Sequence, residues 1–130
     1  MIRTRTVLGP LAAIVVAVAS LAAEARAQDP LALSVTPSII HPGETVTFDV
    51  TGGGPYCPVA LYISQFGFAP IFCRIAVGAF DPSGAWTLQA QVPLDPPINT
   101  DVDVTFCSYG ICSDGYVEGS NFVTVTFTSS

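Results

Sequence analysis

Four cysteines are the residues of this chain best suited to do chemistry: Cys57, Cys73, Cys107 and Cys112. The last two enclose the segment CSYGIC, a spacing that a metal site, a redox centre or a local disulfide could use. A thioredoxin-type redox motif has two residues between its cysteines and lies at a helix N-terminus, which lowers the thiol pKa. A structural zinc site needs four ligands at matched spacing, which these cysteines do not have, and His41 is the only histidine. The pattern therefore favours structural disulfides, and we expect no metal and no cofactor.

Strand parity decides which disulfides we expect. Along a strand every second residue points to the same face. By this rule Cys57 and Cys73 point the same way as the inward-facing residues, whereas Cys107 points to the polar face. A disulfide holds its Cβ atoms about 3.5–4.5 Å apart, so a bond from one face of a sheet to the other is awkward. We therefore expect Cys57–Cys73 to tie two consecutive runs together and Cys107–Cys112 to close over residues 108–111, in preference to the other two connectivities.

The N-terminal segment predicts export. A basic start precedes an apolar run over residues 7–23, and ARA at residues 25–27 gives a small-x-small cleavage site. The run is short for a hydrocarbon core of about 30 Å, so a cleaved signal peptide is favoured over a membrane anchor. We expect a bacterial signal peptide at residues 1–27 and one domain at residues 28–130, which is secreted, at the cell surface or periplasmic. The cysteines would then lie in an oxidising compartment, where an even number favours disulfides.

The charge of the expected domain excludes several partners. Residues 28–130 contain nine carboxylates and one basic side chain, Arg74. Phosphate backbones and anionic lipid headgroups bind clustered Lys and Arg, so nucleic acid and membranes are not expected partners after signal cleavage. We expect an extracellular protein or a glycan as the partner, and a monomeric chain.

Alternating apolar and polar residues predict an all-β fold. In ETVTFDV (44–50) and AWTLQAQV (85–92), every second residue is apolar, which is typical of strands with one buried face. Turn signals such as Asp81-Pro82-Ser83-Gly84 separate the runs. We expect a β-sandwich of about seven antiparallel strands. Its inward-facing residues belong to runs at 31–35, 46–50, 59–63, 71–77, 86–92, 102–106 and 123–127.

Two of these stretches also resemble known modules. VTPSIIHPGETVTFDVTGGGP (35–55) looks like the opening of bacterial immunoglobulin-like domains, where P-x-x-x-x-P-G-x-x-V leads from the first strand into the second. AFDPSGAWTLQAQVP (79–93) is similar to the D-x-x-G hairpin and following strand of such secreted modules. The resemblance implies an immunoglobulin-like or fibronectin-III-like sandwich without catalytic residues. The chain departs from antibody-type domains, because its second strand has no cysteine and Trp86 is on the fifth.

An aromatic segment supplies the first candidate contacts. QFGFAPIF places Phe66, Phe68 and Phe72 around Gly67 and Pro70, which predicts an apolar loop. Such a loop could fold over the end of the sandwich as a minor core. It could instead remain exposed and bind a partner or a glycan.

A second set of candidate ligand contacts lies in an expected loop over residues 109–118 and consists of Tyr109, Asp114 and Glu118. Its carboxylates could offer oxygen ligands to calcium, although the D-x-D-x-D-G pattern is missing. His41 has no evident partner for a Ser-His-Asp arrangement, so no enzyme is expected. The sequence predicts a non-catalytic structural or binding module. The alternative is carbohydrate- or calcium-dependent ligand binding through this loop or the 66–72 aromatic loop.

Overall fold

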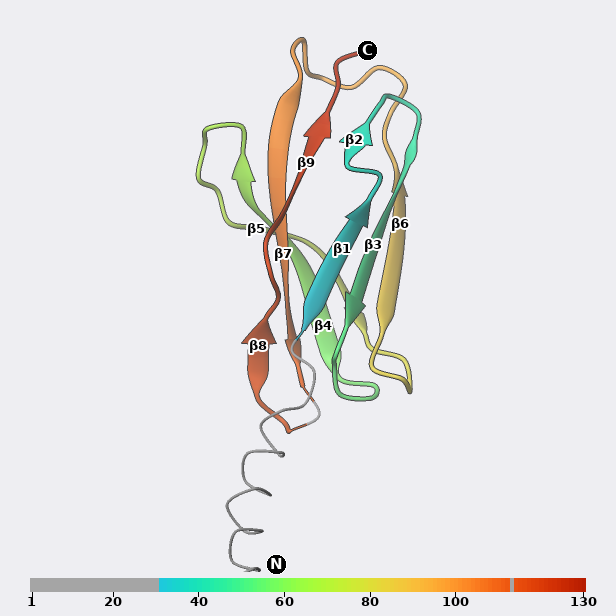
Figure 1. Cartoon of the computed structure of the whole chain (residues 1–130), viewed down its shortest axis with the longest axis vertical. Helices are drawn as coiled ribbons and strands as arrows, with labels where there is room; N and C mark the ends of the chain where they lie inside the picture. The colour runs from blue at the N-terminus through green and yellow to red at the C-terminus, as the bar shows by residue number, and fades with distance from the viewer. Residues whose placement is uncertain (1–30, 113) are drawn as a thin grey trace, which may run out of the picture.

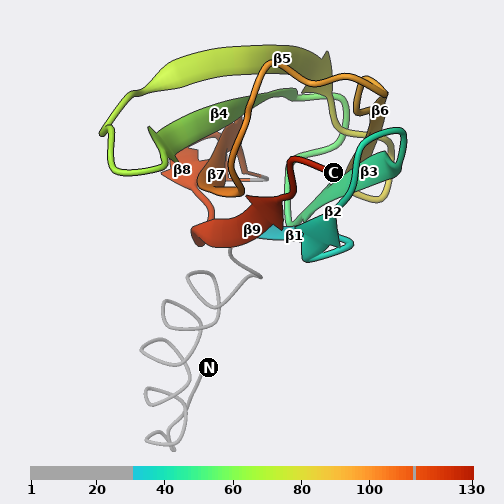
Figure 2. The ribbon, with the colours of Figure 1, turned by 90° about the horizontal axis from the view of Figure 1, so that it is seen from above.

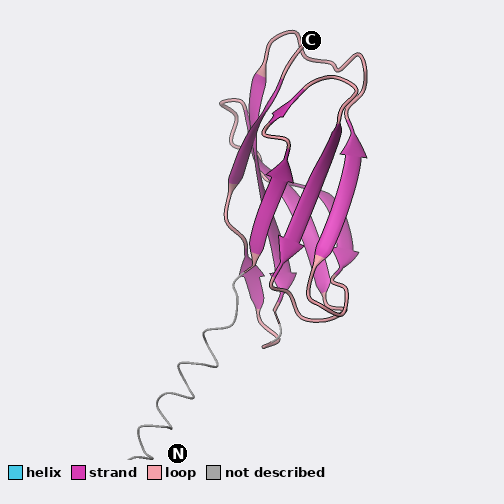
Figure 3. Ribbon diagram, turned by 45° about the vertical axis from the view of Figure 1, so that its right-hand side comes forward, coloured by secondary structure: helices cyan, strands magenta, loops and turns pink. Residues whose placement is uncertain are grey.

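The computed structural model describes residues 31–112 and 114–130, so the predicted signal peptide lies outside the described residues. This part of the chain folds into nine strands in two sheets, with no helix (Figures 1 and 3). The strands are β1 (Ala32–Thr36), β2 (Ile39–Ile40), β3 (Thr45–Thr51), β4 (Pro58–Phe66), β5 (Cys73–Ala79), β6 (Trp86–Gln91), β7 (Val102–Ile111), β8 (Val117–Gly119) and β9 (Val123–Phe127).

The smaller sheet has the order β1-β3-β6 and is antiparallel throughout. Its central strand β3 buries Val46, Phe48 and Val50 and leaves the residues between them more exposed. Phe48 lies opposite Val35 on β1 and Leu88 on β6. Because directly opposed residues of a sheet point the same way, the apolar side chains of all three strands share one face. The predicted alternation is confirmed here.

The larger sheet has the order β2-β9-β7-β4-β5, and β8 pairs with β7 as well. Its longest strand, β7, pairs with β4 along one edge and with β9 and then β8 along the other. Seen from above, this sheet curves round from β5 to β9, and the smaller sheet faces it across the core (Figure 2). The predicted β-sandwich is therefore confirmed, with two very short strands, β2 and β8, in addition to the expected seven.

Phe80 is a core residue packed between two glycines. Its side chain is 1% exposed. A Cβ built on Gly53 would lie 2.1 Å from the Phe80 ring, and one on Gly110 would lie 2.8 Å from it. The ring thus packs directly against the backbone of the β3–β4 connection and of β7. Phe80 was not among the expected core residues.

The expected burial of the run at 71–77 is wrong. Ile71, Ile75 and Val77 are 41%, 44% and 65% exposed, and Ala76 is the residue of β5 that packs against the core. The pairing of β4 with β5 shifts between Leu61 and Tyr62, which changes the face that each residue of β5 presents. In addition, β5 is the edge strand of its sheet. The alternation of apolar and polar residues in the sequence reveals neither the register shift nor the edge position.

The predicted turn at residues 81–84 is confirmed and is organised by a carboxylate. Asp81 Oδ1 accepts hydrogen bonds from the Ser83 hydroxyl at 2.6 Å, from Ser83 N at 2.8 Å and from Ala85 N at 3.0 Å. The Ser83 hydroxyl, followed by the Ala85 amide, lowers the pKa of Asp81 from its ordinary value. The charged carboxylate is therefore the form that holds the turn.

We expect Asp81→Asn to destabilise the protein at pH 7 and to have little effect in acid. Because the folded pKa lies below the unfolded one, the carboxylate stabilises the fold above the unfolded pKa of about 4. That contribution disappears as the pH falls through the lower, folded value. Urea unfolding of both proteins at pH 7 and below pH 3 measures the difference. An equal difference at the two pH values would show that the charge has no role.

Candidate functional site

An aromatic cluster lies on the outer face of the larger sheet. Tyr62 on β4 and Tyr109 on β7 alternate with buried residues of the same strands, so both point away from the core. Phe72, just before β5, stacks on Tyr62 with ring centroids 4.7 Å apart and an interplanar angle of 17°. Tyr109 meets the two rings edge-on, at centroid distances of 5.5 Å from Tyr62 and 6.0 Å from Phe72. Stacked and edge-to-face arrangements are the favourable geometries for pairs of aromatic rings, so they hold the three side chains together.

A groove of about 300 Å³ runs beside this cluster across β5, β4, β7 and β8. Its shape follows from the register, because the small side chain of Ala60 lies between Val77 on β5 and Tyr109 on β7. Further along, Ile111 on β7 lies opposite Val117 on β8. Small residues thus form the floor and larger ones the walls. We call this hollow, together with Tyr62, Phe72 and Tyr109, the outer-face groove.

The outer-face groove is apolar but contains one positive charge. Phe72, Val77 and Val117 are 60%, 65% and 67% exposed, which is unusual for apolar side chains clustered on a protein surface. Arg74 lies opposite Tyr62 and also lines the groove. It is the only Lys or Arg among residues 31–112 and 114–130. The surface can therefore contact a flat apolar group and attract an anionic one.

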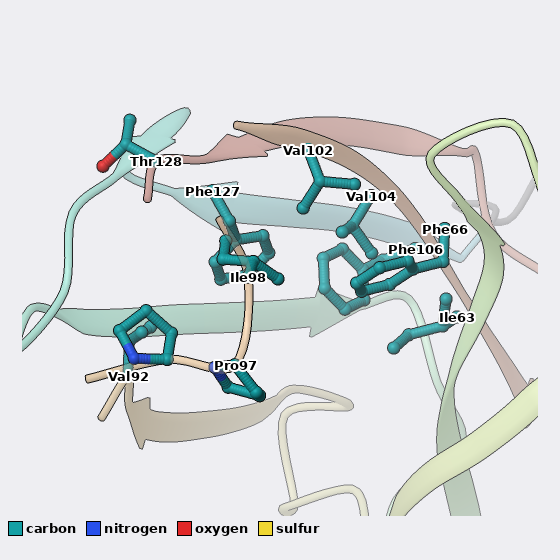
Figure 4. Close-up of a pocket in the computed structure, with 11 residues that line it drawn as sticks. Ile63, Phe66, Val92, Pro97, Ile98, Val102, Val104, Phe106, Phe127 and Thr128 are labelled. Atoms are coloured by element: carbon teal, nitrogen blue, oxygen red, sulfur yellow. The ribbon is translucent and has the colours of Figure 1, made fainter. Parts of the chain in front are cut away.

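A second pocket, of about 210 Å³, lies where the end of β4, the start of β7 and the end of β9 meet (Figure 4). Figure 4 shows Phe66, Phe106 and Phe127 facing it, with Pro97 and Ile98 from the crossover between β6 and β7. No charged side chain is among its lining residues, and the pocket continues the hydrophobic core between the two sheets. We call it the end pocket.

The three phenylalanines of the predicted 66–72 loop do not form one patch. Phe66 ends β4 and lines the end pocket. Phe68 lies at the tip of the turn and is fully exposed, whereas Phe72 joins the aromatic cluster. Backbone hydrogen bonds between Phe66 and Ala69, both 3.0 Å long, close a tight turn that points the side chains apart.

The two predicted disulfide pairings are not formed. The structure contains four free cysteines. Cys73 lies opposite Ile63, near the far end of β4 from Cys57, so about 20 Å of extended strand separates the two. CSYGIC is not a loop: β7 continues through Ile111, and an extended strand places Cys107 and Cys112 about 16 Å apart.

The predicted 109–118 loop is a hairpin between β7 and β8. Asp114 Oδ1 accepts a hydrogen bond from Tyr116 N at 3.0 Å, so it organises the turn. Glu118 lies on β8, where its Oε1 is 3.6 Å from Cys112 Sγ. Burial, followed by the negative charge of Glu118, raises the pKa of Cys112 to about 11. Within the described residues, no three His, Cys, Asp or Glu side chains are grouped so as to hold a metal ion.

Fold and side chains together define an all-β sandwich with an exposed apolar groove on its larger sheet. Searches with protein-family models and against curated proteins found no match. Solved structures that it resembles include the sporulation control protein Spo0M of Bacillus subtilis (16% identity, 78% of this chain and 49% of that chain, TM-score 0.44). They also include a cycloalternan-degrading enzyme of Trueperella pyogenes (18% identity, 71% and 11% covered, TM-score 0.46) and macromomycin (16% identity, 75% and 99% covered, TM-score 0.45).

These similarities concern the arrangement of strands alone. The chain spans about half of the sporulation protein and about a tenth of the enzyme. Neither activity can be transferred to it on that basis. In the described part of the chain, no helix is long and apolar enough to cross a membrane.

Proposed function

We propose that this chain is an exported, non-catalytic, immunoglobulin-like binding module that holds a small ligand with a flat apolar face in the outer-face groove. The observation that carries the proposal is the stacked pair of Tyr62 and Phe72, which lies beside an exposed apolar groove and Arg74, the only Lys or Arg of the described residues. Aromatic side chains offer a large contact area with few rotatable bonds, which favours them in binding sites. Arg74 favours a ligand that also carries a negative charge.

The absence of catalysis is part of the same proposal. The groove is lined by apolar side chains, Tyr62, Tyr109 and Arg74, with no pair of groups suited to acid–base work. His41 lies elsewhere, in an exposed turn, where its Nδ1 is 2.9 Å from the Thr128 hydroxyl. The acidic composition supports the exclusion of nucleic acid, and the N-terminal segment supports export.

The proposal predicts saturable binding of 1-anilinonaphthalene-8-sulfonate, an anion with a flat naphthalene ring, measured by its fluorescence. We expect Phe72→Ser to weaken binding about tenfold, the effect of losing an aromatic contact of roughly 1.4 kcal/mol. Phe68→Ser is the matched control, because Phe68 is more exposed and lies outside the groove. Equal binding by the two variants would remove the groove from consideration.

Arg74→Gln separates charge from apolar contact. We expect it to weaken binding of the sulfonate probe severalfold and to leave N-phenyl-1-naphthylamine, which lacks the sulfonate, unchanged. Ile98→Ser, in the end pocket, should affect neither probe. If Ile98→Ser alone abolished binding, the probe would be in the end pocket and the proposed site would be wrong.

A further inference from the structure

The ends of β4 and β7 bring together two cysteines that are 55 positions apart in the sequence. Val59 lies opposite Gly110 in the antiparallel pair of β4 and β7. Cys57 is two residues before Val59 and Cys112 is two residues after Gly110, so continuing this antiparallel register by two residues would set the two cysteines opposite each other. Figure 1 shows the start of β4 and the end of β7 at the same end of the sandwich.

The hydrogen bonds place Cys112 at the kind of position where opposed side chains come closest. The Ile111 carbonyl accepts a hydrogen bond from Gly54 N, in the connection that leads into β4, at 2.9 Å. The Cys112 amide points the other way and donates to the Tyr116 carbonyl at 2.9 Å. Cys112 is thus at a non-hydrogen-bonded position relative to β4, where opposed Cα atoms lie about 4.5 Å apart. Disulfides accept Cα separations of about 4.4–6.8 Å.

Both cysteines also face the same side of the sheet. Cys112 is 1% exposed and belongs to the hydrophobic core, and Cys57 packs against that core. Gly54 lies beside both residues. A Cβ built on it would lie 2.9 Å from Cys57 Sγ and 3.0 Å from the Cys112 carbonyl oxygen. A side chain at position 54 would therefore be crowded by both cysteine residues.

We propose that Cys57 and Cys112 form a cross-strand disulfide that fastens the start of β4 to the end of β7. The bond requires Cys112 Sγ to leave Glu118 Oε1, which is 3.6 Å away, and to turn toward Cys57. The oxidant is a disulfide-bearing thiol oxidoreductase, or oxidised glutathione in vitro. A thiolate of the pair attacks the oxidant to give a mixed disulfide, and the second thiolate displaces the reduced thiol. Two thiols thus lose two protons and two electrons, which reduce the oxidant's disulfide to two thiols.

The surroundings of the two sulfurs set the order of these steps. Burial and Glu118 keep Cys112 largely protonated, since they raise its pKa. Cys57 is half-buried and more accessible, so it enters the mixed disulfide first. The remaining two cysteines stay reduced. Cys73 lies opposite Ile63 on the inner face, whereas Cys107 lies opposite Tyr62 on the outer face, so β4 separates them.

Peptide mapping of the wild-type protein, treated with oxidised glutathione and alkylated under native conditions, tests the pairing. Chymotryptic cleavage after Tyr56, Phe72, Phe106 and Tyr109 puts each cysteine in its own peptide. We expect CPVALY (57–62) linked to GICSDGY (110–116), with Cys73 alkylated in the folded protein and Cys107 alkylated only after unfolding. A link between GICSDGY and CSY (107–109), or alkylation of both Cys57 and Cys112, would overturn the proposal.

Thermal unfolding gives an independent readout. The disulfide closes a long loop, so we expect Cys57→Ala to lower the Tm by about 10–20 °C. A reducing agent should lower the wild-type Tm to a similar value and leave the Tm of Cys57→Ala unchanged. Cys73→Ala, the matched control, should keep the wild-type Tm and its response to reduction. Wild-type protein that is insensitive to reduction would contradict the cross-link.

Discussion

Replacing Phe80 with alanine is expected to lower the free energy of unfolding by about 3–5 kcal/mol. The ring is 1% exposed and fills the space between Gly53 and Gly110, so its loss removes apolar contacts and leaves a cavity beside two backbone segments. A single domain has only about 5–15 kcal/mol of stability, and each kilocalorie corresponds to about 4–8 °C in Tm. Chemical denaturation followed by Trp86 fluorescence measures the change.

Gly53→Ala is the control for this account of Phe80. In the wild-type background its new Cβ would lie 2.1 Å from the Phe80 ring, so it should destabilise strongly. In the Phe80→Ala background the same methyl group enters the cavity and should cost much less. The two substitutions should therefore be strongly non-additive. Additive effects on the free energy of unfolding would show that the Phe80 ring does not exclude a side chain at position 53.

Replacing Gly84 with alanine is expected to lower the free energy of unfolding by about 2–4 kcal/mol. Gly84 has a φ of 82°, which side-chain-bearing residues adopt at a cost, and its new Cβ would lie 2.3 Å from the Gly53 carbonyl oxygen. The same contact region contains the hydrogen bond from Gly53 N to the Gly84 carbonyl, 3.0 Å long. The substitution therefore strains the backbone and separates the β5–β6 turn from the β3–β4 connection.

Gly115→Ala separates the backbone strain of a positive φ from the steric clash with Gly53. Gly115 has a similar φ of 88°, but a Cβ on it would meet nothing within 4 Å. We expect it to cost only the backbone strain, about 1 kcal/mol. Equilibrium unfolding of both variants gives the comparison. If Gly115→Ala cost as much as Gly84→Ala, the approach of Gly84 to Gly53 would have no energetic role.

The sandwich could be predicted because its central strands follow local rules. On β3, Val46, Phe48 and Val50 are buried on one face, as their alternation predicts. On β5 the same rule fails, since a register shift and an edge position leave Ile75 and Val77 exposed. Both properties depend on which strand pairs with β5, and the alternation of residues within one run does not show its neighbour.

The candidate site was only partly predictable, for the same reason. Phe72 and Tyr109 were among the candidate contact residues, but their meeting with Tyr62 depends on the pairing of β4 with β7. The spacing of CSYGIC suggested a closed loop, whereas pairing with β4 and β8 keeps Cys107 and Cys112 apart on an extended strand. Phe80 lies just after an alternating run and beside a turn. The two glycines that accommodate its ring, Gly53 and Gly110, were the available signal, and they became informative only in three dimensions.

Nuclear magnetic resonance mapping of the bound probe tests the central claim most directly. On titration of the ¹⁵N-labelled protein with 1-anilinonaphthalene-8-sulfonate, the account predicts saturable amide shifts at Tyr62, Arg74 and Tyr109, with Ile98 and Phe127 unchanged. Shifts confined to the end pocket, or no saturable shifts at all, would contradict the claim that the outer face of the larger sheet is a binding surface.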